Sequence, residues 1–190
     1  LRLSYDLELF NGFYINPEIQ FLERRTLKGY KFVELLDSVL INDEPSDFTS
    51  YQAAIANITI SYTPGQKYMR EPNRKVILGS RWPTFYTYYE KGLPNVFGSD
   101  VDHDYILFGI KQTFKIGTIG TSSYHVKAGQ FLNTRVLKDA DMKYNRRSDF
   151  IWFSNPLYSF QGLYTLLPTS RTIYEGHIIH HDNGSIINKI

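Results

Sequence analysis

Apolar and polar residues alternate without exception along the first nine positions of the chain. The apolar set is Leu1, Leu3, Tyr5, Leu7 and Leu9, and the intervening positions are Arg2, Ser4, Asp6 and Glu8. A side-chain period of two places one set on each face of a β-strand. After Asn11-Gly12 the alternation resumes, and Asn-Gly between two alternating segments is the strongest short-range signal for a β-hairpin.

The parity of this hairpin predicts its turn. Directly paired residues point to the same face of a sheet, so a plain two-residue turn that pairs Phe10 with Phe13 would mismatch every side chain. A three-residue loop, Phe10-Asn11-Gly12, pairs Leu9 with Phe13 and matches both faces. We therefore expect that loop, with Gly12 in the left-handed conformation of a bulge-forming turn.

Further strands follow at similar spacing, and helical periodicity is almost absent. Strand patterns cover residues 54–62, 76–78, 81–90, 106–116, 124–128 and 172–181. The strands before and after Gly117-Thr118-Ile119-Gly120 both have even-numbered apolar residues, which requires an odd-length loop. Val33, Leu36 and Leu40 suggest one short helix or turn inside a long loop. The sequence thus predicts an all-β, antiparallel fold with about eight strands in a single segment, 1–190, which we expect to be cut from a longer protein at both ends.

Composition narrows the class of protein. Aromatic residues make up 16% of the chain, charged residues 21%, and the net charge is only +2. No basic run suggests nucleic acid as a partner. The chain has no cysteine, which excludes disulfides and thiolate metal sites. No stretch of about 20 apolar residues suggests a membrane-spanning helix.

Alternation alone does not say whether the apolar face meets a protein core or lipid. Three features favour a transmembrane β-barrel: alternation over a length that crosses the hydrocarbon layer, short and long connections that alternate, and aromatic clusters near strand ends. The alternative is a soluble β-sandwich or small barrel that binds carbohydrate or lipid, with Trp82–Tyr89 as a stacking platform. Charges of both signs on the polar face are compatible both with a water-filled barrel lumen and with the exposed face of a soluble sheet.

The barrel hypothesis assigns each face a neighbour. Membrane-facing positions are expected to be Leu3, Tyr5, Leu7, Leu9, Phe13, Ile15, Ile58, Ile60, Ile106, Phe108 and Ile110. Lumen-facing positions are expected to be Asp6, Glu8, Glu18, Lys111 and Lys115.

Residues 58–190 resemble the C-terminal barrel of an outer-membrane family of unknown function from the Bacteroidota. The matching pieces are Tyr62–Tyr68, Arg81–Phe85, Phe114–Gly120, Ala128–Asn133, and the tail Tyr174–His181 with Asn183-Gly184 and Asn188–Ile190. Members usually carry a carboxypeptidase-regulatory-like domain before the barrel, which is related to the BamA/TamA-like surface-antigen barrels. The resemblance implies an integral outer-membrane β-barrel without enzymatic activity. The chain lacks a Val-Arg-Gly-Phe-type loop signature, so a role in translocation or insertion is not supported by motif. It also lacks the aromatic-terminated last strand of the family barrels, so we expect a closing segment to be missing.

No group of residues in the sequence predicts a catalytic or metal-binding site. His177 and His181 share a strand face while His180 points away, which is too few ligands for zinc. Asp100, Asp102 and Asp104 resemble the start of a calcium loop, but its glycine and its bidentate glutamate are replaced by Tyr105 and Lys111. We read that segment as a solvated loop, and we expect no catalytic residue, metal or cofactor.

The expected function is therefore that of an outer-membrane component. Lipid and lipopolysaccharide are the expected surroundings, and the long loops 27–50, 91–104 and 133–148 are the expected contacts for other surface proteins. The resemblance suggests participation in an outer-membrane assembly or in surface-protein export or biogenesis.

Overall fold

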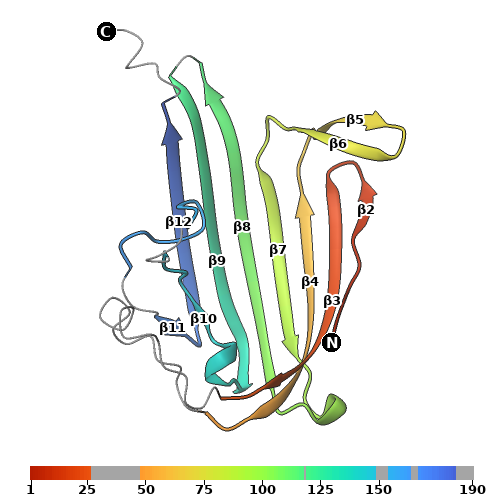
Figure 1. The fold of residues 1–190 in the computed structure, drawn as a ribbon, viewed down its shortest axis with the longest axis vertical. Helices are drawn as coiled ribbons and strands as arrows, with labels where there is room; N and C mark the ends of the chain where they lie inside the picture. Colours follow the sequence, from red (N-terminus) through yellow and green to blue (C-terminus); the bar gives the residue numbers. More distant parts are fainter. Residues whose placement is uncertain (27–47, 118, 149–153, 164–166, 183–190) are drawn as a thin grey trace, which may run out of the picture.

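The computed structural model describes residues 1–26, 48–117, 119–148, 154–163 and 167–182. Most of these residues lie in one large antiparallel sheet (Figure 1). Its strands are β1 (Arg2–Ser4), β2 (Leu7–Phe10), β3 (Phe13–Arg24), β4 (Tyr51–Tyr62), β7 (Thr84–Gly92), β8 (Asp102–Ile116), β9 (Gly120–Val136) and β12 (Thr172–His181). The short helix or turn suggested by Val33, Leu36 and Leu40 lies outside the described residues.

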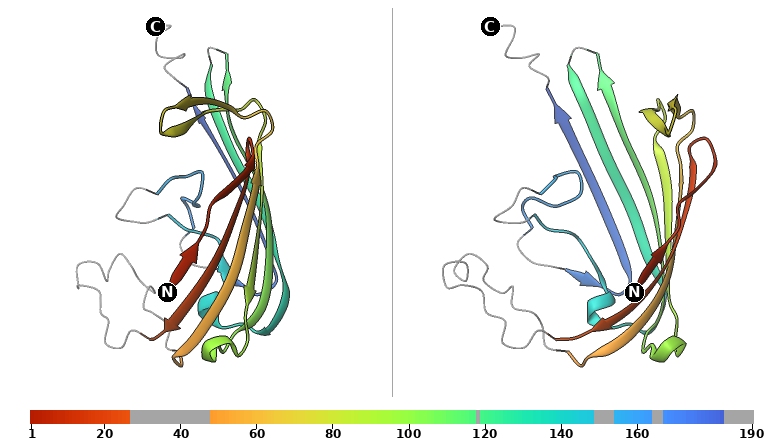
Figure 2. Two further views of the ribbon diagram at one scale, coloured as in Figure 1. Left: turned by 90° about the vertical axis from the view of Figure 1, so that its right-hand side faces the viewer. Right: turned by 45° about the vertical axis from the view of Figure 1, so that its right-hand side comes forward.

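The sheet is an up-and-down meander in the order β1-β3-β4-β7-β8-β9-β12, with β2 also paired to β3. Every neighbouring pair is antiparallel. The described strands form no closed barrel: the sheet is open, and it is strongly curved (Figure 2). No helix of the described residues is long and apolar enough to cross a membrane.

Two short ribbons flank the sheet. β5 (Lys67–Glu71) pairs with β6 (Arg74–Gly79) in the connection after β4, at the same end of the sheet as the turns at 11–12 and 117–119. β10 (Lys143–Tyr144) pairs with β11 (Pro168–Thr169) between β9 and β12. The described parts of the connections after β3, β7 and β9 begin at the other end, where two single-turn helices also lie, η1 (Val96–Gly98) and η2 (Asp139–Asp141).

Strand pairing separates the side chains into two faces. Leu7 pairs with Ile15, Ile15 with Ile60, and this face continues through Thr87 and Phe108 to Ala128 and Tyr174; we call it the apolar face. Glu18 pairs with Asn57 and Asn57 with Glu90, and Lys111 pairs with His125, which pairs with His177; we call this the polar face. The predicted apolar and polar residues that have a pairing partner therefore lie on opposite faces of the sheet. Tyr5 and Asp6 lie between β1 and β2, and Leu9 falls at the register shift of β2, so pairing does not assign them to a face.

The turn of the first hairpin differs from the prediction. Phe10, not Leu9, pairs with Phe13, and their rings stack at 4.8 Å. The extra residue is absorbed by a register shift between Glu8 and Phe10, so a bulge in the strand restores the parity that we assigned to a three-residue loop. Gly12 does have a positive φ, of 84°. The loop between Ile116 and Gly120 has the expected odd length.

The β5–β6 ribbon is held to the first hairpin by charge. Lys75 on β6 contacts the Glu8 carboxylate and donates a hydrogen bond to Asn11 Oδ1 at 2.9 Å. The hydrogen bond to Glu8 raises the pKa of Lys75, although the ammonium stays in contact with solvent. Residues 63–75, whose connection the sequence left ambiguous, thus belong to a separate ribbon rather than to the sheet.

Candidate functional site

Burial across the sheet is the reverse of that in a sheet packed on an apolar core. On β12, Tyr174 and Ile178 of the apolar face are 73% and 79% exposed, whereas Glu175 and His177 of the polar face are 4% and 9% exposed. Phe108, Val126 and Phe85 are likewise exposed on the apolar face. The polar face is therefore the enclosed one, and it holds the candidate site.

The enclosure comes from the chain between β9 and β12. The described residues of this connection, 137–148, 154–163 and 167–171, lie on the concave side of the curved sheet, against its polar face (Figure 2); we call them the cover segment. Two small apolar clusters support it from the sheet, one around Tyr51 and Val101 and one formed by Tyr105, Phe131 and Ile173.

Asp141 anchors the cover segment near the end of β3. Its carboxylate accepts a hydrogen bond from Arg24 Nη2 at 2.7 Å and another from the Tyr51 hydroxyl at 2.7 Å. Asp141 is 4% exposed, so its charge depends on these two partners. The three residues come from η2, β3 and β4 and are far apart in the sequence.

Glu90 on β7 is the second anchor. Its Oε1 accepts hydrogen bonds from Lys143 Nζ at 2.7 Å and from His103 Nε2 at 3.1 Å, and its Oε2 accepts one from the Tyr88 hydroxyl. Lys143 belongs to β10, so this buried carboxylate ties the cover segment to the middle of the sheet. Lys143 also lies 5.1 Å from the centre of the Tyr105 ring, a cation–π distance.

A third group of contacts joins β9, β12 and the cover segment. Lys127 forms an ion pair with Glu175 at 2.9 Å. His125 hydrogen-bonds the Tyr86 hydroxyl at 2.6 Å, and its ring lies 5.1 Å from that of Tyr158. Phe160 packs on His177 at 4.5 Å. His177 is thus enclosed beneath an aromatic ring.

Tyrosine rings cover glycines on the polar face. Tyr86 lies across its paired residue Gly109, and Tyr105 lies diagonally across Gly129, so closely that a β-carbon at either glycine would overlap the ring. Gly92 is equally constrained, because a β-carbon there would lie 2.7 Å from His103 Nδ1. An aromatic ring over a strand glycine restores contact where the glycine offers no side chain.

A cavity of about 450 Å³ remains between the sheet and the cover segment. Its lining carries both signs of charge, with Arg24, Lys127 and Lys143 beside Glu90 and Asp141. No group of three or more potential metal ligands occurs in the part of the chain that the structure describes. Because the charged groups are paired with one another, the arrangement suits a structural network that fills an interior.

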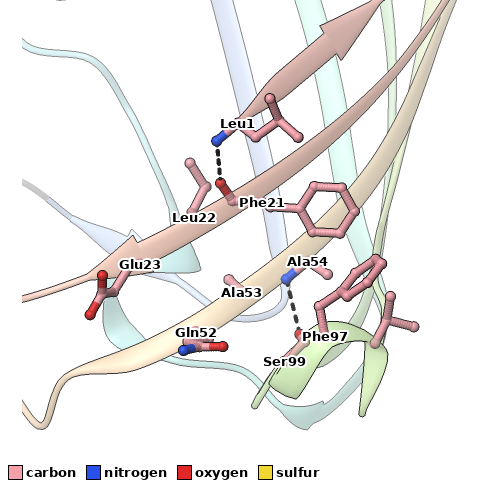
Figure 3. A pocket seen from close by; sticks show the side chains of 10 residues that line it. Leu1, Phe21, Leu22, Glu23, Gln52, Ala53, Ala54, Phe97 and Ser99 are labelled. Atoms are coloured by element: carbon pink, nitrogen blue, oxygen red, sulfur yellow. Dashed lines mark hydrogen bonds between the residues drawn. The ribbon is translucent and has the colours of Figure 1, made fainter.

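The apolar face has shallow hollows of a different kind. One, shown in Figure 3, lies where η1 approaches β3 and β4 and is lined by Phe21, Leu22, Ala54 and Phe97. Ser99 Oγ accepts a hydrogen bond from Ala54 N at 3.0 Å, which holds η1 against the sheet. Phe97 is 81% exposed, has a φ of 49°, and contacts Phe21 edge-on at 5.1 Å.

The aspartate-rich segment is not the solvated loop that we expected. Asp102 and Asp104 begin β8, and the true connection spans only residues 93–101. Asp102 accepts hydrogen bonds from Asn133 at 2.8 Å and Arg135 at 3.1 Å, and Asp104 accepts one from Lys91 at 2.8 Å. These carboxylates are therefore used in cross-strand ion pairs. The predicted loop 133–148 is also shorter than expected, because β9 extends to Val136.

Sequence reasoning missed most of the buried network. His125 lies at a polar position of a predicted strand, so the alternation could have placed it on the polar face. The segment 81–90 has aromatic residues on both faces, so its pattern does not assign a face to Glu90. Nothing local to Asp141 or His103 signals burial, because their partners are supplied by other strands.

The comparisons with known proteins bear on the whole chain. A family model described as the C-terminal domain of a family of unknown function (DUF5686) matches residues 1–190. No curated protein sequence matches the chain. No solved structure matches it either. The chain therefore belongs to the DUF5686 family, of which it represents the C-terminal domain.

Proposed function

We propose that this chain forms part of the wall of a transmembrane β-barrel in the outer membrane of a Gram-negative cell, and that it has no enzymatic activity. The observation that carries the proposal is the reversed burial: large apolar side chains point away from the protein, while carboxylates and imidazoles are enclosed. A lipid bilayer is the solvent in which that distribution lowers the free energy. In water, the same exposed face would promote association.

The strands suit the dimensions of a bilayer. A tilted strand needs about nine to eleven residues to cross the hydrocarbon layer, and β8 has 15 residues and β9 has 17. On β3, Phe13 belongs to one aromatic group with Phe10 and Tyr62, and Phe21 meets Phe97 at the other end. These two positions are about 26 Å apart along the strand at ~3.3 Å per residue. The apolar band of outer-membrane barrels is ~25 Å tall and has aromatic girdles at both borders.

The polar face supports a lumen that is filled by the cover segment. Buried ion pairs from Asp141 and Glu90 hold that segment to the wall, and tyrosines pack over glycines beneath it. We infer that the protein is a structural component of the outer membrane, surrounded by lipid and lipopolysaccharide. Its connections 93–101 and 137–148 would contact other proteins of a surface assembly or an export or biogenesis system.

A soluble β-sandwich that binds carbohydrate or lipid is the competing function. A sandwich needs a second sheet over the apolar face. Among the described strands, β10–β11 lies on the polar side and β5–β6 projects from one end. The Trp82–Tyr89 segment does not form one stacking platform either, since Tyr86 and Tyr88 point to the polar face and Phe85 and Tyr89 to the apolar face.

Single-cysteine spin labels test the proposal directly, because the natural sequence has no cysteine. Labels at Phe108 and Val126 report on the apolar face, and labels at Lys111 and Thr113 on the polar face; all four positions are exposed in the described structure. In bilayers, the first pair should collide with oxygen and the second pair with a water-soluble nickel complex. Equal nickel accessibility on both faces, or a protein that stays monomeric in buffer without detergent, would overturn the proposal.

A further inference from the structure

The edge of the sheet at β12 has the properties of an interior strand. Within the described residues, β12 pairs with β9 on one side and with no strand on the other. Phe131 N donates a hydrogen bond to Arg171 O at 2.8 Å, so the odd-numbered residues from Arg171 onward are the ones whose backbone groups bond to β9. In an antiparallel pair, hydrogen-bonded and non-hydrogen-bonded positions alternate. The backbone groups of Tyr174, Gly176 and Ile178 therefore point to the free edge.

This edge lacks most of the features that protect natural sheet edges. Proline, lysine, bulges and short length are the usual protections. β12 spans ten residues, pairs in continuous register, and contains neither proline nor lysine. Its side chains are also only partly satisfied. Glu175 Oε1 and His177 Nε2 are buried and have no hydrogen-bond partner in the structure. A neighbouring strand could supply both the ladder bonds and the missing polar contacts.

Strand direction gives an independent reason to expect a neighbour. The sheet has seven strand positions, since β1 and β2 both occupy the place beside β3. Because every step across the sheet is antiparallel, the first and seventh positions run in the same direction. Bacterial single-chain barrels are antiparallel throughout and have an even number of strands. β12 therefore has the wrong direction to close on β1 and β2, and closure requires an odd number of additional strands.

We propose that the β12 edge is occupied by the next strand of the same polypeptide, which runs antiparallel to β12. The meander supports this occupant, because each described step of the sheet from β2 to β12 joins strands that follow one another in the chain, apart from the short side ribbons. The chemistry of the edge defines the strand. It has apolar side chains in line with Tyr174 and Ile178, and on the other face a hydrogen-bond donor that reaches Glu175. The count of strands rests on the proposed barrel, whereas the occupancy of the edge does not.

Photo-crosslinking in the intact protein tests the occupant. Tyr174 is replaced by benzoylphenylalanine, a ring of similar shape at a position with ample exposure, and the crosslinked peptides are identified by mass spectrometry. Crosslinks to β9 serve as an internal control, because Tyr174 pairs with Ala128. A further crosslink within the same molecule to a peptide beyond residue 182 supports the proposal. Crosslinks only to β9 or lipid, or a crosslinked dimer of two copies, overturn it.

A pair of proline variants provides a second measurement. Ile179 directs its amide to β9, and Ile178 directs its amide to the free edge. Ile179→Pro therefore removes a ladder hydrogen bond whether or not a strand occupies that edge, whereas Ile178→Pro removes one only if the edge is occupied. We expect Ile178→Pro to lower the urea midpoint of the intact protein as much as Ile179→Pro does. A midpoint for Ile178→Pro near that of the unaltered protein would show a free edge and overturn the proposal. If spin labels at Phe108 still report lipid, the barrel wall stands and only this inference fails.

Discussion

Replacing Gly109 by alanine should destabilise the protein through a single ring contact. A β-carbon at Gly109 would overlap the Tyr86 ring, so the ring must leave its position or the strands must shift. Overpacking of this kind costs about 1–3 kcal/mol. Displacing the ring also breaks the hydrogen bond between Tyr86 and His125, which contributes about 1 kcal/mol. We expect a combined loss of about 2–4 kcal/mol in the free energy of unfolding.

Gly176 provides the matched control. It lies on the apolar face of β12 within the same sheet, has no positive φ, and a β-carbon there would meet nothing within 4 Å. Gly176→Ala should therefore change the free energy of unfolding by no more than about 0.5 kcal/mol. Urea unfolding of the intact protein in bilayers, followed by tryptophan fluorescence, measures both variants under the same conditions.

A double-mutant cycle isolates the contact. In a Tyr86→Ala background the ring is gone, so Gly109→Ala should cost little more than Gly176→Ala. An equal loss with and without the Tyr86 ring would refute the reasoning, because the effect would then come from the backbone. So would a Gly109→Ala variant as stable as the unaltered protein.

Three further predictions concern the cover segment and the apolar face. Asp141→Ala leaves Arg24 and Tyr51 without their acceptor and, because Arg24 is partly exposed, should cost about 1.5–3 kcal/mol in urea unfolding, whereas Asp139→Ala, at an exposed position of the same η2, should have no measurable effect. Glu90→Gln keeps the size of the side chain but removes its charge. The free energy of opening the cover segment should fall by ~1.4 kcal/mol, which corresponds to protease cleavage about ten times faster. An unchanged cleavage rate would contradict the anchoring role. Phe108→Arg should reduce stability in bilayers by about 2–4 kcal/mol, a loss that a water-exposed surface position would not show.

The sequence predicted the strands better than it predicted their ends. Period-two alternation placed β4, β8 and β12 and assigned the faces of β4 and β8, because alternation is a local property of an extended backbone. The predicted turn after β2 was wrong. A bulge in the strand can match the two faces of the hairpin as well as an extra loop residue can, and the sequence pattern is the same for both. The aspartates at the start of β8 were read as a loop because their partners, Lys91 and Asn133, lie on neighbouring strands.

By itself the sequence determined that the chain is β-rich, that strands such as those at 1–9, 54–62 and 106–116 have one apolar and one polar side, and that the chain has no cysteine chemistry. Only the tertiary structure decided which side is enclosed. That outcome depends on the curvature of the sheet and on the chain that covers its polar face, and both arise from contacts between distant residues, such as Arg24 with Asp141 and Glu90 with Lys143. A repeating pattern of side chains fixes local geometry, whereas burial is a property of everything that surrounds a residue, so it can be assigned only once those surroundings are in place.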